Sequence, residues 1–158
     1  MATEDVKTMQ FKVTPEKLLE VLLDRDYQIA REKANGALEA SVNELSRDAD
    51  RFVYEVHTKE YAKGITGLDK SKTEQAMTTY EWDLTNKQAS WRYKGPHPAK
   101  VWGSLHIEPS GDQSKLTAKF NVEIKIPLMG KKIEKMVVKE VKKGWDRFEK
   151  VILEFCDR

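Results

Sequence analysis

The sequence predicts an α+β protein: a curved antiparallel sheet of seven strands packed on one long C-terminal helix, with two short helices between the first two strands. Three observations predict this class. Apolar residues recur at helical spacing between Leu128 and Phe155, apolar and polar residues alternate through most of Ala37–Ile124, and a helix start at Thr14 follows a short strand. A strongly bent sheet cannot contact a straight helix along its whole length, so we expect a cavity between them.

The long helix is predicted within Leu128–Phe155 because apolar residues at steps of four and three fall on one stripe. A stripe that carries a tryptophan and two phenylalanines needs a broad apolar surface to pack against. The rest of the chain supplies such a surface only as a sheet. The stripe comprises Ile133, Val137, Val141, Trp145, Phe148, Ile152 and Phe155.

The segment before the main sheet is predicted to form a strand and two short helices. Met9–Val13 alternates apolar and polar residues, as a strand does. Thr14-Pro15 starts a helix, because threonine caps free N–H groups and proline lacks the N–H that would go unsatisfied there. Asp24 or Asp26 is expected to cap a second helix, which ends at Asn35-Gly36.

Six further strands are predicted from runs in which apolar residues occupy every second position. Short polar turns separate most of these runs, which favours an antiparallel meander with one apolar face. The runs are Leu38–Val42, Phe52–Val56, Ala76–Leu84, Ala89–Tyr93, Val101–Ile107 and Leu116–Ile124.

Two segments interrupt the alternation, and we expect both to be loops at the same end of the protein as the junction at Gly130. Tyr61–Lys72 contains Gly64 and Gly67, which allow wide backbone freedom, so we interpret it as a mobile lid over the cavity. Gly95–Ala99 contains two prolines with a fixed φ, so we interpret it as a rigid rim.

Composition limits the class of protein. The 158 residues suit one domain, residues 1–158, and 28 basic against 26 acidic residues give a net charge of +2, which makes no case for nucleic acid. Cys156 is the single cysteine and cannot form a disulfide within the chain. Met1–Lys12 has no apolar run like that of a secretory signal, and no window approaches the roughly 20 apolar residues of a membrane span. We therefore expect a cytoplasmic protein.

The predicted order of elements resembles the helix-grip fold of the START-like or Bet v 1-like (SRPBCC) superfamily over nearly the whole chain. Ile126–Glu134 is similar to the Ile-Pro-Leu-x-Gly-x-x-Ile-Glu junction between the last strand and the long helix in a bacterial branch of unassigned function, and Asp24–Tyr27 resembles the same branch. The resemblance implies a cavity between sheet and helix that often holds lipids, sterols, quinones or polyketides. Some members are enzymes and others are co-chaperones, so the fold alone does not define the activity.

A ligand-binding surface is predicted from the large residues on the apolar strand positions and on the helix stripe. Tyrosine hydroxyls there would orient the polar end of an apolar ligand. The alternative is that the same side chains simply fill the core. The predicted ligand-binding residues are Tyr54, Tyr80, Trp82, Trp91, Tyr93, Phe120, Val137 and Val141.

Two lysines at the start of the long helix stand out, because cations there oppose the helix dipole. Lys131 and Lys132 are predicted to contact the head group of a ligand, together with the exposed N–H groups of the helix. The alternative is that both are ordinary solvated lysines. The neighbouring Pro127, Gly130 and Glu134 are explained structurally as the end of a strand, a turn and a helix start.

No catalytic or metal-binding motif is found in the sequence, and we predict no cofactor. His57 and His106 have the parity opposite to their apolar neighbours, so both are expected to face solvent, whereas His97 lies in the proline-flanked loop at the expected cavity mouth. Glu140 borders the helix stripe and would act as an acid or base only if burial raised its pKa.

Three functions remain. We favour non-catalytic binding, transport or sensing of a hydrophobic, lipid-like small molecule, with a possible transient contact to a membrane surface. An enzyme of the polyketide-cyclase or hydrolase type would need an acid, a base or a histidine facing inward. A protein-interaction module would need a large exposed apolar patch. The sequence indicates neither the ligand nor the oligomeric state.

Overall fold

The computed structural model describes residues 2–64 and 67–158, and its elements follow the predicted order. The long helix and the pair of short helices lie where the sequence places them, so the α+β class is confirmed. The elements are β1 (Thr3–Phe11), α1 (Pro15–Leu23), α2 (Arg25–Ala34), β2 (Glu39–Arg47), β3 (Arg51–Gly64), β4 (Gly67–Asp83), β5 (Gln88–Lys94), β6 (Ala99–Ser110), β7 (Gln113–Ile124) and α3 (Gly130–Cys156).

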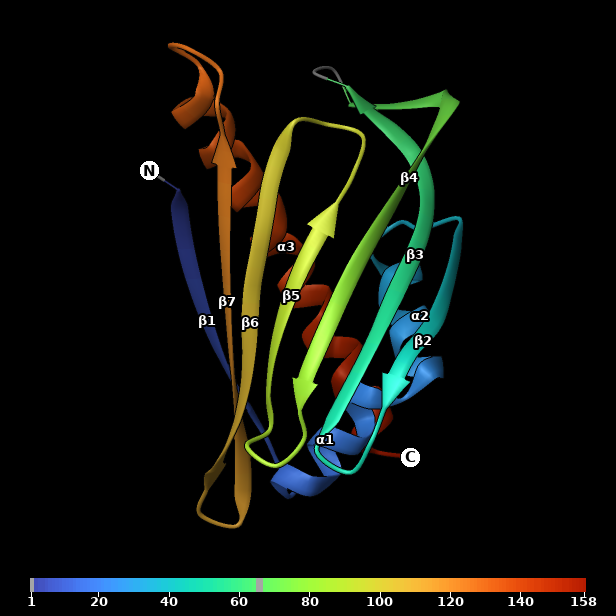
Figure 1. Ribbon diagram of the computed structural model, residues 1–158, viewed down its shortest axis with the longest axis vertical. Helices are drawn as coiled ribbons and strands as arrows, with labels where there is room; N and C mark the ends of the chain where they lie inside the picture. Colours follow the sequence, from blue (N-terminus) through green and yellow to red (C-terminus); the bar gives the residue numbers. More distant parts are fainter. Residues whose placement is uncertain (1, 65–66) are drawn as a thin grey trace.

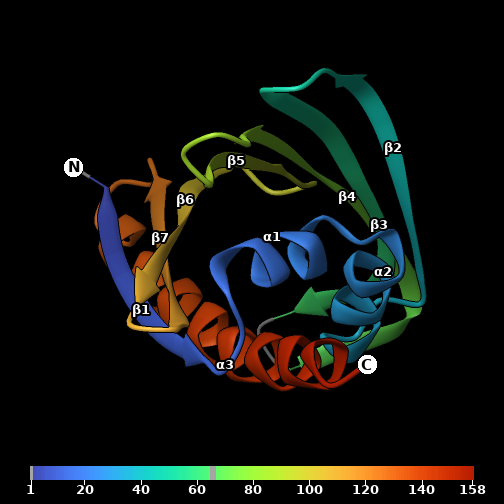
Figure 2. The same ribbon diagram turned by 90° about the horizontal axis from the view of Figure 1, so that it is seen from below.

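The seven strands form one sheet in the order β1-β7-β6-β5-β4-β3-β2, in which every neighbouring pair is antiparallel (Figure 1). Strands that follow one another in sequence are neighbours, except that β1 pairs with the last strand, β7. The sheet bends around α1 and α2, and α3 lies across its open side (Figure 2). This arrangement is the predicted helix-grip layout.

Both predicted helix starts are confirmed by their capping bonds. The hydroxyl of Thr14 accepts a hydrogen bond from the N–H of Lys17 at 3.2 Å, and the carboxylate of Asp24 accepts one from the N–H of Tyr27 at 3.0 Å. Each side chain thereby satisfies an N–H group that has no partner inside its helix. The end of α2 is also as predicted, since Gly36 has a φ of +103° just after the helix.

The core occupies the lower part of the molecule in the view of Figure 1. There the C-terminal half of the α3 stripe is buried with α1 and with the inner face of the sheet. The N-terminal half is covered less, because Ile133, Val137 and Val141 are only partly buried. Among the strands, α3 lies mainly against β1 and β7. Buried residues of the stripe are Trp145, Ile152 and Phe155.

The interpretation of Tyr61–Lys72 as a loop is wrong. Tyr61 pairs with Thr73, Ala62 with Asp69 and Gly64 with Gly67, so the segment is the outer part of a β3–β4 hairpin with a register shift after Tyr61. Residues 65 and 66 of the predicted lid lie outside the described part of the chain. The alternation was hidden because this part of the hairpin carries polar residues on both faces. The paired residues of this segment are therefore strand residues of the sheet and do not form an irregular lid.

The predicted first strand, Met9–Val13, is too short and begins too late. β1 begins at Thr3, and its inward positions Asp5 and Lys7 carry charges that the apolar pattern does not detect. Both face the long helix, where Lys7 pairs with Asp146, and Lys142 pairs with Asp5 at 3.5 Å. Ion pairs thus take the place of apolar contacts along this edge.

The junction between β7 and α3 is held by Glu134 in a way that the sequence did not indicate. Glu134 lies beyond the first turn of α3, and its carboxylate accepts hydrogen bonds from the hydroxyl of Thr3 at 2.6 Å and from the N–H of Ile124 at 2.9 Å. Gly130 is required for close approach, because an added Cβ would lie 2.4 Å from the carbonyl oxygen of Ile124. Glu134 therefore joins the helix to two strands of the sheet instead of interacting mainly with the helix dipole.

Candidate functional site

The aromatic residues predicted to bind a ligand lie in adjacent rows on the inner face of the sheet. Tyr54, Tyr80 and Trp91 are paired across β3, β4 and β5, and the rings of Tyr54 and Tyr80 stack with centroids 5.2 Å apart. Tyr54, Tyr80, Trp82 and Phe120 are buried, Trp91 is partly buried, and Tyr93 is 36% exposed. The more buried members form the wall of the core. Whether these residues contact a ligand stays a prediction.

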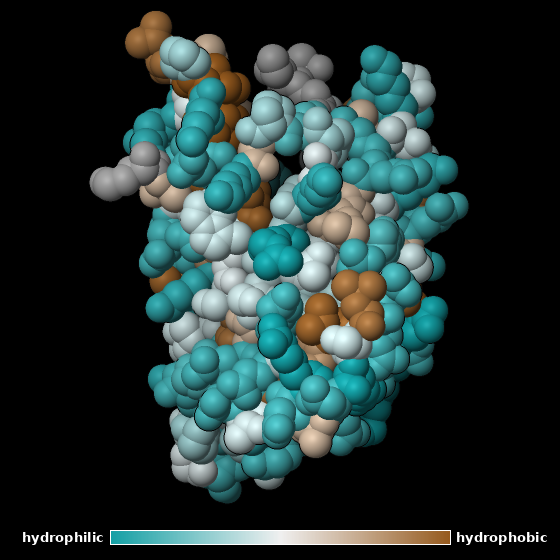
Figure 3. Space-filling model, in the orientation of Figure 1, coloured by the Kyte–Doolittle hydropathy of each residue, from teal (hydrophilic) through white to brown (hydrophobic). Residues whose placement is uncertain are grey.

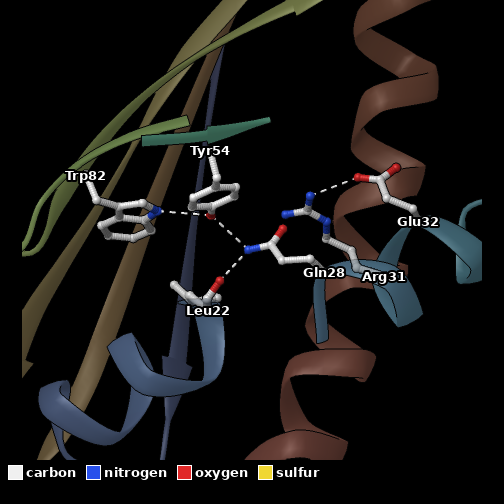
Figure 4. Close-up of polar contacts among 6 residues, drawn as sticks. All are labelled: Leu22, Gln28, Arg31, Glu32, Tyr54 and Trp82. Carbon is white, nitrogen blue, oxygen red and sulfur yellow. Dashed lines mark hydrogen bonds and ion pairs between the residues drawn. The ribbon is translucent and has the colours of Figure 1, made fainter. Parts of the chain in front are cut away.

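A chain of hydrogen bonds crosses this wall and centres on Tyr54 (Figure 4). The hydroxyl of Tyr54 accepts hydrogen bonds from Nε1 of Trp82 at 3.1 Å and from Nε2 of Gln28 at 2.9 Å. Nε2 of Gln28 also donates to the carbonyl oxygen of Leu22. These hydrogen bonds hold α2 against β3 and β4. Oε1 of Gln28 is buried and finds no hydrogen-bond partner within residues 2–64 and 67–158.

Arg31 lies one helical turn beyond Tyr27 on α2 and is only 6% exposed. Its Nη2 donates to the carboxylate of Glu32 at 2.8 Å, and its guanidinium lies 5.3 Å from the ring centre of Tyr80 and 5.2 Å from that of Phe148. Its Nε has no partner among the described residues. Burying an arginine is costly unless it is paired, so the contact with Glu32 and the aromatic rings is what permits it here.

Burial shifts the pKa values of the ionisable groups in this interior. It raises the pKa of the Tyr54 and Tyr80 hydroxyls, although the positive charge of Arg31 opposes the rise. Burial alone would lower the pKa of Arg31, but the neighbouring Tyr80 and Glu32 raise it well above its ordinary value. At neutral pH the site therefore presents neutral tyrosine hydroxyls and a charged guanidinium that is balanced by one carboxylate.

Tyr93 marks the edge of this interior and is surrounded by acidic groups. Burial raises the pKa of Tyr93 to about 12, and the charges of Glu60, Glu74 and Glu32 contribute. Glu74 in turn lies 3.3 Å from Nε2 of His97 in the β5–β6 connection. The prediction that His97 lies at the mouth of a cavity stays a prediction. The side chain of His97 is 59% exposed, so the pair is open to solvent.

At the upper end of the molecule, as drawn in Figure 1, the inner face of the sheet and the side of α3 that faces it form two walls that are only partly covered. This end carries the β5–β6 connection, residues 95–98, and the β7–α3 connection, residues 125–129, which confirms that the Gly95–Ala99 segment lies at the same end as the Gly130 junction. Figure 3 shows the surface hollowed where Figure 1 draws the β5–β6 connection. Inward-facing residues of both walls are partly exposed, namely Thr58, Thr78, Trp91 and Val101 on the sheet and Val137, Val138 and Val141 on α3.

Two other hollows lie on the outside of the molecule. One, of about 830 Å³, is a depression on part of the outer face of the sheet, and polar side chains such as Glu81, Ser90 and Ser104 line it. The other, of about 690 Å³, lies at the β7–α3 junction between Lys125, Lys131 and Glu134. Neither hollow lies between the sheet and α3, so a binding cavity there stays a prediction.

The predicted head-group lysines lie at this junction. Lys131 contacts Glu134 at 3.1 Å with a side chain that is 58% exposed, and Lys132 is exposed. The predicted aromatic residues, by contrast, lie on the inner face of the sheet. The predicted aromatic residues and the predicted head-group lysines are therefore separate in the structure. The aromatic residues lie in the interior, and the lysines lie at the β7–α3 junction.

Gln28 and Arg31 are the site residues that sequence reasoning missed. Both are polar, and a polar residue on a short surface helix usually faces water. A usable signal was their spacing, because Tyr27 and Arg31 are four residues apart and so share one face of α2 with Gln28 beside them. That face is the buried one.

The structure offers no sign of a metal site, since the described residues contain no group of three or more histidine, cysteine, aspartate or glutamate side chains able to hold an ion. In the same part of the chain, no helix is long and apolar enough to cross a membrane. His57 and Glu55 approach each other at 3.2 Å on the outer face, where His57 is exposed as predicted.

The order of elements and the antiparallel sheet are those of the helix-grip fold, which solved structures of a START superfamily protein and of Ara h 8.0201 share. The chain belongs to the family described as "Protein of unknown function (DUF2505)", whose model matches residues 7–156. No curated protein matches the sequence.

Solved structures with a similar fold come from several kinds of protein. The Zhui aromatase/cyclase from Streptomyces sp. R1128 superimposes with a TM-score of 0.67 at 12% identity, over 100% of this chain and 95% of the other. Ara h 8.0201 gives 0.64 at 14% identity, over 98% and 99% of the two chains. A START superfamily protein from Mycobacterium smegmatis gives 0.58 at 18% identity, over 94% and 98%. At these identities the similarity establishes the fold alone.

Proposed function

We propose that the protein binds a hydrophobic small molecule, without transforming it, between the upper parts of β3–β6 and the N-terminal half of α3. The observation that carries the proposal is the incomplete burial of apolar residues on the inner side of the sheet and of α3, such as Val101 on β6 and Val141 on α3. In a solid core such apolar side chains would be fully buried, because interiors pack closely. An apolar ligand would complete their burial.

The predicted residues divide into two roles in this proposal. Trp91, Tyr93, Val137 and Val141 contact the ligand, while Tyr54, Tyr80, Trp82 and Phe120 form the wall behind it. The polar end of the ligand is directed to Arg31, whose Nε has no partner among the described residues. Arg31 is already neutralised by Glu32, and acidic side chains surround Tyr93, so a neutral carbonyl or hydroxyl group fits better than a carboxylate.

A matched pair of valine substitutions tests this site. Val101→Phe adds bulk to an inward-facing position, whereas Val6→Phe adds the same bulk to an outward position on β1 that is 46% exposed. Binding of a fluorescent long-chain alcohol probe is followed through the quenching of tryptophan emission, with Trp91 at the site. We expect saturable binding by the natural protein, at least a tenfold loss in Val101→Phe, and no change in Val6→Phe.

The proposal fails if the natural protein shows no saturable binding of the probe, or if Val101→Phe binds it as well as Val6→Phe does. Unfolding of both variants is measured in parallel, so that a loss of binding is separated from a loss of structure. Mass spectrometry of the recovered probe tests the enzyme alternative, since a non-catalytic protein returns the probe unchanged.

A further inference from the structure

The connection between β7 and α3 carries an apolar tip, Ile126–Met129, that projects from the upper end of the molecule. Leu128 is fully exposed at 105%, Met129 is 52% exposed and Ile126 is 40% exposed. Figure 3 shows the tip as a hydrophobic projection where Figure 1 draws the β7–α3 connection. Single exposed apolar residues are common on protein surfaces, but three in one projecting tip call for an explanation.

The backbone holds Leu128 outward at an energetic cost. Leu128 has a φ of +67°, a conformation that bulky residues rarely adopt and that glycine or asparagine adopts without difficulty. Neither the strain nor the exposure helps to bury apolar surface within the chain. A leucine at this position is explained better by something outside the chain than by the stability of the fold.

Lysines outnumber carboxylates around the tip. Residues 125–135 contain the lysines Lys125, Lys131, Lys132 and Lys135 and one carboxylate, Glu134, which is only 2% exposed and bonded inward. The side chain of Lys125 is 86% exposed. The whole chain has a net charge of only +2, so this basic character is local. The hollow of about 690 Å³ beside the tip is lined by Lys125 and Lys131 and also by Glu123 and Glu134, with which these lysines pair at 3.5 and 3.1 Å. The excess positive charge therefore comes from Lys132 and Lys135, which are both exposed.

We propose that the apolar tip and its lysines dock the protein on an anionic lipid bilayer. Leu128 and Met129 enter the boundary between head groups and acyl chains, and the lysines contact lipid phosphates. A narrow projection offers little area to a protein partner, whereas a bilayer accepts a few apolar side chains at once. The role predicted for Lys131 and Lys132 as head-group contacts is thereby assigned to membrane lipids. This proposal does not depend on the ligand site.

Docking at this end has a consequence for the interior. The tip lies at the same end of the molecule as the β5–β6 connection and the partly covered walls. A docked protein would therefore present its least covered end to the bilayer. An apolar molecule would then move between bilayer and protein with little exposure to water.

Co-sedimentation with vesicles tests the proposal through Leu128→Gly. Glycine removes the apolar side chain and also removes the backbone strain, so the variant is expected to unfold at the same temperature as the natural protein or higher. We expect the natural protein to bind vesicles of mixed phosphatidylcholine and phosphatidylserine, and not vesicles of phosphatidylcholine alone. Leu128→Gly should lose at least tenfold in affinity. Leu45→Gly, the same change at an exposed position of β2, should bind as the natural protein does.

Charge is tested separately with Lys132→Glu, which should weaken binding to the anionic vesicles by at least tenfold, and raised salt should have a similar effect. The proposal is overturned if the natural protein does not bind the anionic vesicles, or if Leu128→Gly binds them unchanged. A dimer of the natural protein that Leu128→Gly dissociates, without vesicle binding, would instead assign the tip to contact between two copies and would also overturn it. Failure of probe binding in the interior would leave this result unaffected.

Discussion

Tyr54 receives two buried hydrogen bonds, one from Trp82 and one from Gln28, whose Nε2 also donates to Leu22. Nε1 of Trp82 and Nε2 of Gln28 both point to the same hydroxyl oxygen, and all three side chains are at most 2% exposed. A buried donor that loses its acceptor is left without water as well, so it pays the full cost of desolvation. The hydroxyl thus stabilises the fold whatever the ligand.

Tyr54→Phe should lower the free energy of unfolding by about 1–3 kcal/mol, the usual range for leaving a buried polar group unsatisfied. Denaturant unfolding measures the loss. Tyr93→Phe is the matched control, because the hydroxyl of Tyr93 lies at the exposed edge, and its removal should change stability by no more than about 0.5 kcal/mol. Equal stabilities of the two variants would contradict the importance of the Tyr54 contacts.

Glu134 gives a second prediction at the scale of one residue. The hydroxyl of Thr3 holds the pKa of Glu134 down to about 2, with further help from the N–H of Ile124 and from Lys131. A carboxyl whose pKa is lower in the folded state stabilises the protein above its unfolded pKa of 4.5, and this stabilisation is lost as pH falls towards 2.

The difference in unfolding free energy between the natural protein and Glu134→Gln should therefore shrink as pH falls from 4.5 to 2. Urea unfolding at a series of pH values measures this difference. Glu140→Gln removes an exposed carboxylate from the same helix and should show no such trend. A difference that stays constant across this pH range would mean that the ionised carboxylate is not what stabilises the junction.

At the scale of the element, α3 is packed unevenly along its length. Trp145 is 8% exposed and packs with Phe148 at 5.6 Å between ring centres, and Ile152 is buried beyond it. Trp145→Ala should cost ~3 to 5 kcal/mol, because it leaves a large cavity under the helix. Nε1 of Trp145 has no partner among the described residues, so Trp145→Phe should cost clearly less. Thermal or denaturant unfolding within about 0.5 kcal/mol of the natural protein for Trp145→Ala would contradict this packing.

How far the elements can be predicted from the sequence depends on whether they bury apolar side chains. Apolar residues at every second position predict the inner strands of the sheet, and apolar residues at steps of three and four predict α3, since each of these elements buries one apolar face. The same rule fails for β1, where Asp5 and Lys7 face the helix through ion pairs. It also fails for the outer part of the β3–β4 hairpin, where Ala62 is buried but most of the other described residues are exposed on both faces.

The candidate site shows the same limit more sharply. The aromatic wall can be predicted, because Tyr54, Tyr80 and Trp82 share one parity with the rest of the core. Arg31 and Gln28 cannot be assigned to the interior from apolar periodicity, since their burial depends on partners distant in sequence or on rings that surround the guanidinium. The strained Leu128 is similarly invisible, because the sequence shows an apolar residue but not its φ.

At the scale of the whole molecule, burial is polarised along the long axis. The lower end contains the closed core around α1, whereas the upper end carries partly exposed inner walls, the apolar tip and the acidic groups around Tyr93. Segments with few buried contacts open more readily than the core does. The upper end is thus the part of the molecule whose protection a bound apolar molecule can increase.

Hydrogen exchange should show this polarity directly. Without ligand, amides in the first half of α3, up to about Val141, should exchange faster than those from Trp145 to Phe155, because the first half is covered less. Addition of the long-chain alcohol probe should slow exchange in that first half and in the facing strands β5 and β6, while the second half changes little. Val101→Phe, which fills the same space with a side chain, should slow exchange in the first half of α3 without probe and reduce the further effect of the probe. If the probe instead slowed exchange in the C-terminal half of α3, the proposed binding site between the N-terminal half of α3 and the sheet would be wrong.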